Sequence, residues 1–434
     1  MEKVFQNYHK HTYWSNIFTP DSTTSIEDYI DRCLETGSQV VSSVEHGWQS
    51  HYYKVYEAVN KANTQLQKRR DNGEENVPKD LKFIFGVEAY WVKDRLPQTV
   101  IDEETGKEKI VKDSANQHMI ILARNEEGRR EINDILSEAN ISGYHYKPRI
   151  DLSLIKQYLH KENVLITSAC VAGWDYEDID DIVLDLAERF KGSYYLEVQY
   201  HDTDKQKALN KHIVALHKQY DIPLIMGCDS HYIYETDTTE RDNLLVAKNI
   251  HYPQEEGWFM DFPTYEMAYE RFKVQNVLSD EEIQQAMENT NVCLTFEDIT
   301  FDKDIKLPTL YPNLTQQEKD FKLMNLVKEA WEIEYAPYLS QEKKKEYLAG
   351  IKNELETIIE TKMTDYFLLD YEIVKLGKER GGIISKTARG SGGSFFVNTL
   401  LGFSNLNRFE APVKLYPERF MSKTRILQTK SLPD

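Results

Sequence analysis

Imidazole and carboxylate side chains occur in two closely spaced pairs, one near the start of the chain and one past its middle. His9 and His11 are separated by one residue, as are Asp229 and His231. Side chains two positions apart on an extended strand point to the same face of that strand. Each pair can therefore offer two ligands to one metal ion, and the spacing predicts a metal-binding site.

Four further side chains that bind metals accompany apolar, strand-like runs. His46 directly follows the run 40–44, and Cys170 follows a similar run. In parallel barrels, the residues that carry out chemistry lie beyond the C-terminal ends of the strands. Glu88 lies within such a run and His118 lies at the start of one, so these two fit the rule less well. All four are candidate ligands.

The mixture of imidazole, carboxylate and thiolate donors indicates which ions the site would take. Such donors suit Zn²⁺, Mn²⁺ or Fe, and they suit Mg²⁺ or Ca²⁺ alone poorly. The candidates are too many for one tetrahedral ion, so we expect two or three ions. Ions about 3.5–4 Å apart are typical of phosphoester hydrolysis, where they hold the attacking and leaving oxygens. A single buried histidine or cysteine is more often a core residue, and the two pairs are what favour a metal site.

A second candidate site is the glycine-rich run Arg389-Gly390-Ser391-Gly392-Gly393-Ser394, which precedes an apolar helix pattern at 395–401. Glycines ahead of a helix let backbone N–H groups approach an anion, and Lys386 and Arg389 could add direct contacts to a phosphate. The run is not a Walker A loop, because no Gly-Lys-Ser/Thr follows. It predicts phosphate binding, although a flexible loop that caps a helix would have the same composition.

The elements expected to position these residues alternate between strands and helices. Amphipathic patterns at 23–37, 178–192 and 205–220 predict helices, each with a capping signal at one or both ends. Strand, helix and strand in repetition predict an α/β fold with a parallel sheet, either open or closed into a barrel. The expected strands are 4–8, 40–44, 81–92, 118–123, 164–168, 194–199 and 223–227.

The amino-acid composition of the chain changes after about residue 280. Upstream, the polar segment 94–116 predicts a hairpin-like insertion. Segments 281–292 and 316–359 are rich in Glu, Lys and Leu and predict helices of a connecting region, whereas the chain beyond 362 turns apolar and glycine-rich, which predicts a second α/β domain. We therefore expect two domains, at residues 1–290 and 291–434.

Composition narrows the class of protein. The net charge of −19 argues mildly against a protein that coats nucleic acid, although it leaves room for a local basic channel and fits carboxylates gathered around metal ions. Four cysteines without a C-x-x-C pair exclude a zinc ribbon and make a disulfide framework improbable. The sequence has no run of eighteen apolar residues and no secretory signal pattern, so we expect a cytoplasmic protein without a membrane span.

Several of these segments together resemble the PHP (polymerase and histidinol phosphatase) domain. The similar runs are His9-Lys10-His11-Thr12, Glu45-His46-Gly47, Gly86-Val87-Glu88-Ala89-Tyr90 and Asp229-Ser230-His231-Tyr232. The resemblance implies a distorted (βα)7-type barrel with two to three divalent ions, Zn, Mn or Fe. Asp21 enters the ligand set through the resemblance alone. The implied ligands are His9, His11, Asp21, His46, Glu88, His118, Cys170, Asp229 and His231.

Motifs along the rest of the chain resemble the bacterial C-family replicative DNA polymerases. They are Tyr146-Lys147-Pro148-Arg149, Met363-Thr364-Asp365-Tyr366-Phe367-Leu368, Arg389-Gly390-Ser391-Gly392 and Tyr416-Pro417-Glu418-Arg419-Phe420. The resemblance implies a helical connector after the barrel and then part of an α/β nucleotidyltransferase-like palm. There, Arg389, Gly390, Ser391 and Gly392 would contact the triphosphate of an incoming nucleotide, with Lys386 as a further cation nearby. Lys386-Thr387-Ala388 stands where Gly-Pro-Gly is more usual.

The same resemblance places the family's catalytic aspartate pair directly after Asp434. We therefore expect that this chain does not polymerise DNA by itself, and that it is a fragment or one half of a split polymerase. For the complete polymerase, the resemblance implies DNA and dNTP as substrates and Mg as the ion of the polymerase site. It also implies the sliding clamp and other replisome subunits as partners of regions beyond residue 434.

Three functions stay open at this point. The first is the N-terminal part of a replicative polymerase whose metal site is either a 3′–5′ exonuclease (phosphodiesterase) or purely structural. The second is a stand-alone PHP-type phosphoesterase that acts on a small phosphorylated substrate, which residues 291–434 argue against. The third is a non-catalytic partner domain of another polymerase subunit.

Overall fold

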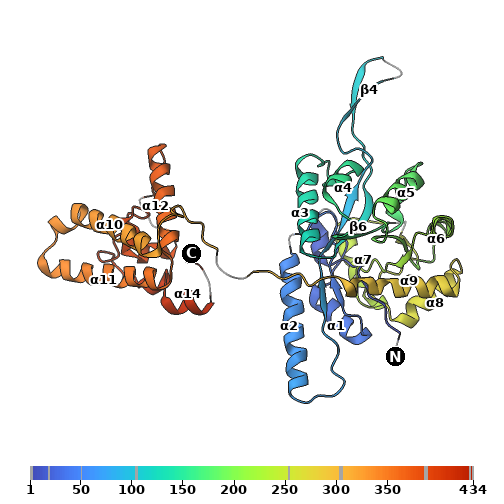
Figure 1. Cartoon of the computed structure of the whole chain (residues 1–434), viewed down its shortest axis with the longest axis horizontal. Coiled ribbons are helices and arrows are strands. Elements are labelled where there is room, and N and C mark those ends of the chain that lie inside the picture. Colours follow the sequence, from blue (N-terminus) through green and yellow to red (C-terminus); the bar gives the residue numbers. More distant parts are fainter. Residues whose placement is uncertain are drawn as a thin grey trace. The chain divides into compact units, whose positions relative to one another are not determined.

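The computed structural model divides the chain into two compact units, Met1–Thr300 and Phe301–Asp434 (Figure 1). Residues 291–300 lie with the first unit, and the domain division at 290/291 stays a prediction. The structure describes residues 3–17, 20–49, 51–102, 106–252, 255–302, 306–385, 390–429 and 432.

A six-stranded sheet forms the centre of unit 1, in the order β10-β9-β8-β6-β3-β7. Strands β8, β9 and β10 are parallel, but β6 is antiparallel to both of its neighbours, β3 and β8. The parallel sheet predicted from the sequence is therefore wrong at β6, which runs against both neighbours. The chain returns from β3 to β6 without a crossover helix, and an antiparallel neighbour needs none. The strands are β3 (Gly86–Trp91), β6 (Gln117–Ala123), β7 (Arg149–Ile150), β8 (Val164–Thr167), β9 (Tyr194–Val198) and β10 (Leu224–Met226).

A smaller sheet pairs β1 (Val40–Ser42) with β2 (Lys82–Ile84) in parallel. The single strand predicted at 81–92 is thus two strands, because β2 pairs with β1 while β3 pairs with β6 and β7. The named strands of the described residues do not close into a ring. The mixed α/β class is confirmed.

The segment that carries His9 and His11 lies between the two sheets. His11 N–H donates to Ser230 O at 2.8 Å, and Val44 N–H donates to Lys10 O at 3.1 Å. The strand predicted at 4–8 is wrong, since the described chain there forms no ladder. Side chains take the place of the ladder: backbone N–H groups of residues 39 and 40 donate to Gln6 Oε1.

Helices α1 (Ile26–Thr36), α5 (Ile179–Arg189) and α6 (Asp204–Tyr220) confirm the three predicted amphipathic patterns. In α1, Ser25 and Asp28 form a capping box, and Gly37 ends the helix with a φ of 75°. The other helices of unit 1 are α2 (Tyr52–Asp71), α3 (Glu126–Ile141), α4 (Leu152–Tyr158), α7 (Thr238–Ala247), α8 (Tyr265–Gln275) and α9 (Asp280–Asn289).

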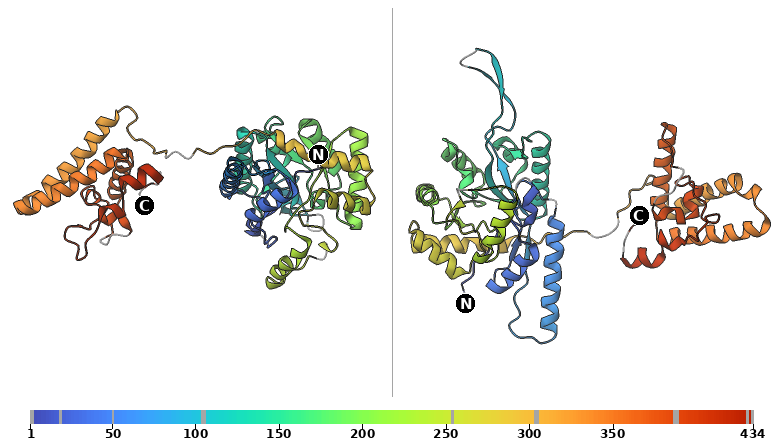
Figure 2. Two further views of the ribbon diagram at one scale, coloured as in Figure 1. Left: turned by 90° about the horizontal axis from the view of Figure 1, so that it is seen from below. Right: turned by 180° about the vertical axis from the view of Figure 1, so that it is seen from behind.

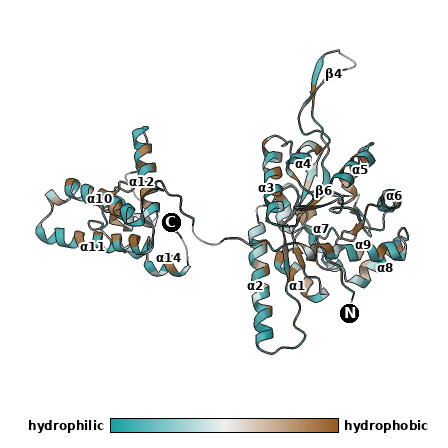
Figure 3. Ribbon diagram, viewed as in Figure 1, coloured by the Kyte–Doolittle hydropathy of each residue, from teal (hydrophilic) through white to brown (hydrophobic). Residues whose placement is uncertain are grey.

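The core of unit 1 lies along its strands. Val164, Leu165 and Ile166 of β8 are fully buried, and hydrophobic segments gather at the centre of this unit, whereas α2 is mostly hydrophilic (Figure 3). The predicted insertion is confirmed as an antiparallel hairpin, β4 (Gln98–Ile101) with β5 (Glu108–Val111), which projects from the unit (Figure 2).

The described residues of unit 2 form helices and 3-10 turns without a named strand. The helical connector is confirmed, but the strands of a second α/β domain are not seen among these residues. Apolar side chains at helical spacing build the core instead, with Leu323, Val327 and Trp331 on one helix. The helices are α10 (Gln316–Glu334), α11 (Gln341–Glu360), α12 (Thr364–Glu379), α13 (Phe396–Leu400) and α14 (Lys423–Thr429). No helix in the described part of the chain has the length and apolar character to cross a membrane.

Candidate metal centre

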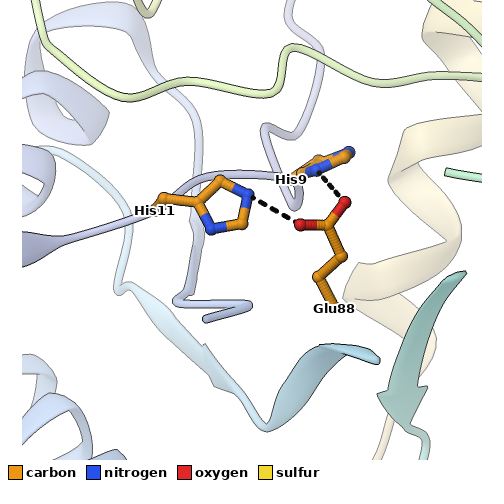
Figure 4. Close-up of side chains that lie close together, drawn as sticks. All are labelled: His9, His11 and Glu88. Carbon is orange, nitrogen blue, oxygen red and sulfur yellow. Dashed lines mark ion pairs between the residues drawn. The ribbon is translucent and has the colours of Figure 1, made fainter. Parts of the chain in front are cut away.

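The nine side chains predicted as ligands lie in one connected cluster in unit 1. Glu88, in the middle of β3, is at its centre. Its Oε1 lies 3.5 Å from His9 Nε2 and its Oε2 lies 3.4 Å from His11 Nε2 (Figure 4). The H-x-H spacing thus places both imidazoles against one carboxylate; that the pair binds one metal ion stays a prediction.

Glu88 also contacts the ligands predicted from the other strands. His46 Nδ1 lies 2.6 Å from Glu88 Oε2, and His118 Nδ1 lies 3.1 Å from Glu88 Oε1. Cys170 Sγ lies 3.4 Å from His118 Nδ1 and 3.9 Å from Glu88 Oε1. Glu88 and His118 come together because β3 and β6 are adjacent, with Tyr90 opposite His118 in the register.

Asp229 completes a second part of the cluster. Its Oδ1 lies 3.2 Å from His9 Nε2, 3.3 Å from His11 Nε2 and 3.2 Å from His231 Nε2. Asp229 lies three residues beyond the end of β10 and has a φ of 49°, in the left-handed region that aspartate tolerates better than most residues.

Asp21, which entered the ligand set through the family resemblance alone, also lies in the cluster. Its Oδ2 lies 2.8 Å from His46 Nε2 and 3.0 Å from His231 Nδ1. Three groups of side chains have ligand atoms close enough to hold one ion each. They are His9, His11 and Glu88; His11, Asp229 and His231; and His46, Glu88 and His118.

Several of the converging atoms lack a hydrogen-bond partner among the described residues. They lie near carboxylate oxygens but without the angles of hydrogen bonds. Buried polar atoms are nearly always satisfied, and several buried donor atoms that face one another without hydrogen-bond partners are typical of a cation-binding site. The donor set therefore fits divalent ions of the Zn, Mn or Fe type. The atoms are His9 Nε2, His11 Nε2, His46 Nδ1, Glu88 Oε2 and His231 Nδ1.

The electrostatics of the cluster agree with a cation site. Burial alone would lower the pKa of His46, but Glu88 and Asp21 outweigh it and raise the pKa to about 10. Burial likewise opposes the rise at His231, where Asp21 and Asp229 bring the pKa to about 9. In the metal-free protein, protons on these imidazoles supply the positive charge that the carboxylates need. Metal ions would take over that role and displace the protons.

His9 is oriented by a carboxylate that sequence reasoning did not include in the site. His9 Nδ1 lies 2.7 Å from Glu197 Oε1, and both side chains are fully buried. Tyr8 and Thr167 donate hydroxyl hydrogen bonds to Glu197 Oε2 at 2.7 and 2.8 Å. This arrangement keeps the proton of His9 on Nδ1 and leaves Nε2 free to face a cation. A carboxylate between two apolar residues of a buried strand, Leu196 and Val198, was the available signal.

Arg241 of α7 is a second residue that the sequence did not reveal. Its NH2 group donates to Asp21 Oδ1 at 3.0 Å and its Nε donates to Asp21 O at 2.6 Å. Arg241 also bonds to Glu255 at 2.7 Å. The helix therefore fixes Asp21, which lies on a segment without regular structure. No local sequence pattern indicates that Arg241 contacts a residue 220 positions away in the chain.

The cluster borders a cavity of about 370 Å³. Six of the nine candidate ligands line it, while His9, His11 and Glu88 lie outside the lining and are almost fully buried. A closed structural metal site would have no such opening. The six lining ligands are Asp21, His46, His118, Cys170, Asp229 and His231.

The predicted phosphate loop is described only in part. Lys386 and Arg389 lie outside the described residues, as does Asp434. Gly390 has a φ of 70° and is followed by a 3-10 turn, Ser391–Ser394. Gly392 O accepts from Asn398 Nδ2 at 2.9 Å, and Ser391 Oγ has no hydrogen-bond partner among the described residues. Phosphate binding by Gly390, Ser391 and Gly392 stays a prediction.

Comparison with known proteins gives two family matches. Residues 7–201 match the PHP domain, and residues 322–434 match the bacterial DNA polymerase III alpha NTPase domain. The PHP match at residues 7–201 includes seven of the nine clustered side chains, and Asp229 and His231 lie beyond it.

Relatives match along the whole chain. It is 25% identical to a DNA polymerase III subunit alpha of Aquifex aeolicus, over 100% of this chain and 36% of the relative. It is 25% identical to one of Borreliella burgdorferi and 26% identical to one of Treponema pallidum, each over 99% of this chain and 34% of the relative. The chain thus spans about a third of the length of these relatives. The chain is thus similar to a PHP domain and, further along, to an alpha NTPase domain, in the same polypeptide as in part of the DNA polymerase III alpha subunits that it resembles.

Proposed function

We propose that the metal centre of unit 1 is a metal-dependent phosphodiesterase that removes nucleotides from a DNA 3′ end. One observation carries the proposal: buried imidazole and carboxylate atoms, which have no hydrogen-bond partner in the described part of the chain, converge beside a cavity. Divalent ions held there would act as Lewis acids on a phosphodiester and lower the pKa of water. The DNA substrate is proposed from the family, whose relatives are named DNA polymerase III subunit alpha.

The residues of the chain divide between two tasks in this proposal. Asp21, His46, His118, Cys170, Asp229 and His231 border the cavity and would hold ions where a substrate can reach them. His9, His11 and Glu88 close the cluster on its buried side and exclude water there. Glu197 fixes the tautomer of His9, and Arg241 fixes Asp21.

Two alternatives use the same ligands. If the ions only stabilised the fold, the cluster would not need a cavity along six of its members. A stand-alone phosphoesterase for a small metabolite would not need the alpha NTPase segment that follows. Both observations favour hydrolysis within a polymerase polypeptide.

We also propose that unit 2 contributes to template-directed DNA synthesis in a complete polymerase. The match at residues 322–434 includes the whole predicted phosphate loop, and Ser391 Oγ has no hydrogen-bond partner among the described residues. Lys386, Arg389, Gly390, Ser391 and Gly392 would contact the triphosphate of a dNTP, with Mg as the ion of that site. Contacts with a sliding clamp or other replisome subunits stay predictions.

The exonuclease proposal is tested with the full chain after loading with Zn²⁺, Mn²⁺ or Fe²⁺. A single-stranded oligonucleotide labelled at its 5′ end should be shortened from its 3′ end, and His9→Ala should reduce the rate at least about a hundredfold. His212→Ala is the matched control, because His212 is exposed, pairs with Asp180 at 2.6 Å and is not among the nine clustered side chains. Equal rates for wild type and His9→Ala would assign the activity to a contaminant. If the folded chain is loaded with metal and still cleaves nothing, the ions have a structural role.

A further inference from the structure

The wall of the metal cavity carries side chains that the metal centre does not use. Two of them are residue types that commonly bind nucleic acid. Trp258 has a large aromatic face, and Lys205 has a cationic side chain. Both line the same cavity as the six candidate ligands. Trp258 lies between α7 and α8, and Lys205 lies in the first turn of α6.

The Trp258 ring is held in place from one side. It stacks on His201 with ring centroids 4.8 Å apart and an angle of 7° between the planes. His201 is fully buried and is fixed in turn, because Phe259 N–H donates to its Nδ1 at 3.1 Å. The indole is only partly buried, and it also lines a second cavity of about 620 Å³. The two cavities share Trp258, Glu255 and Met260 as a common wall.

Lys205 is the one cationic side chain of lysine or arginine type among the described residues that line the metal cavity. Its side chain is 66% exposed, and its Nζ lies 3.6 Å from Asp175 Oδ1, a long contact for an ion pair. The remaining charged lining residues outside the ligand set are the carboxylates Asp175 and Glu255. An exposed ion pair of this kind is worth little, so a phosphate can displace Asp175 at small cost.

We propose that Trp258 and Lys205 bind the terminal nucleotide of a single-stranded polynucleotide, with its base on the indole and its phosphate at the lysine. The inference rests on the proposed function for the position of the scissile phosphate at the metal cluster. An aromatic ring accepts a base only when that base is unstacked, which selects a single-stranded end over a duplex. Stacking on a ring face is also tolerant of sequence, so one site serves all four bases.

The test is binding of a fluorescent oligothymidylate, labelled at its 5′ end, to the metal-loaded chain. A phosphorothioate linkage at the 3′ end prevents cleavage, and fluorescence anisotropy gives the Kd. Trp258→Ala should weaken binding on the order of tenfold, whereas Trp258→Phe keeps a ring face and should stay within about threefold. Lys205→Gln should weaken binding a few-fold and should reduce the slope of log Kd against log salt concentration by about one. Lys207→Gln is the matched control, since Lys207 lies on the same helix, pairs with Asp202 and does not line the cavity.

A second oligonucleotide, which lacks its 3′-terminal base, separates stacking from general damage to the protein. Wild type should bind this abasic end about tenfold more weakly than the normal end, and Trp258→Ala should bind the two ends equally. If Trp258→Ala discriminates as well as wild type does, or if Lys207→Gln has the effect of Lys205→Gln, the inference is wrong. If these binding differences hold but an unmodified strand is not cleaved, the inference stands and the exonuclease proposal fails.

Discussion

Glu197→Gln tests how the protein prepares His9 for a metal ion. Glu197 Oε1 accepts from His9 Nδ1 at 2.7 Å and from Gln199 Nε2 at 2.9 Å, and Oε2 accepts from the hydroxyls of Tyr8 and Thr167. Those hydroxyls can turn and accept from an amide, so glutamine fits with its oxygen still facing His9. The substitution therefore removes the charge and keeps the shape.

The magnitude follows from the loss of that charge. A buried hydrogen bond to a charged group contributes about 1.5–3 kcal/mol, against about 0.5–1.5 kcal/mol for a neutral one. A loss of about 1.4 kcal/mol in metal binding corresponds to about tenfold in affinity. That value lies at the lower end of the range of about 10–100-fold for partners that orient metal ligands.

The assay is competition with a chromogenic chelator, which gives the Zn²⁺ affinity of each variant. Glu188→Gln on the exposed side of α5 changes the net charge equally and serves as the control. Circular dichroism confirms that both variants are folded. An affinity for Glu197→Gln that equals wild type would refute the assigned role of Glu197, and so would an equal loss in Glu188→Gln.

Three further predictions concern other parts of the molecule. First, folding raises the pKa of His46 to about 10 and that of His231 to about 9. In the metal-free chain, these two histidines therefore stabilise the fold fully below the unfolded pKa of about 6.5, and this stabilisation is lost as the pH rises through 9 and 10. The melting temperature of the chelator-treated chain should fall over this range, and a rise would contradict the argument. Second, a Cβ on Gly227 would lie 1.9 Å from Glu197 Oε1, so Gly227→Ala should weaken Zn²⁺ binding at least as much as Glu197→Gln. Gly377→Ala, where a Cβ meets nothing within 4 Å, should leave binding unchanged, and equal effects of the two would reject the clash. Third, buried Glu354 accepts from Val397 N–H and Arg408 Nε, both at 2.8 Å, so Glu354→Ala should destabilise unit 2 by about 3–5 kcal/mol. Hydrogen exchange should then rise in α11 and α13 while the metal content stays constant; unchanged exchange would show that this contact is not needed.

Local patterns predicted the parts of the structure that depend on neighbours in sequence. The H-x-H and D-x-H spacings placed four candidate ligands on shared faces, and these side chains do converge. The helix from Ile26 to Thr36 begins and ends where the capping signals stand, because Ser25 and Gly37 satisfy its terminal backbone groups.

The features that the sequence did not predict depend on distant parts of the chain. The antiparallel direction of β6 depends on its pairing with β3 and β8, which no periodicity in the sequence reports. Glu197 and Arg241 act through partners 188 and 220 residues away. Beyond residue 362, the described residues form helices where strands were expected, because short apolar runs fit a strand and a buried helix equally well.

Metal content tests the central claim most directly. The full chain, purified without chelators, is analysed by inductively coupled plasma mass spectrometry next to a His9→Ala/His231→Ala variant. The account predicts two to three equivalents of Zn, Mn or Fe in the wild type and fewer in the variant, because those two imidazoles belong to separate ligand groups. A folded wild-type chain that holds less than one equivalent, after incubation with all three metals, would contradict it.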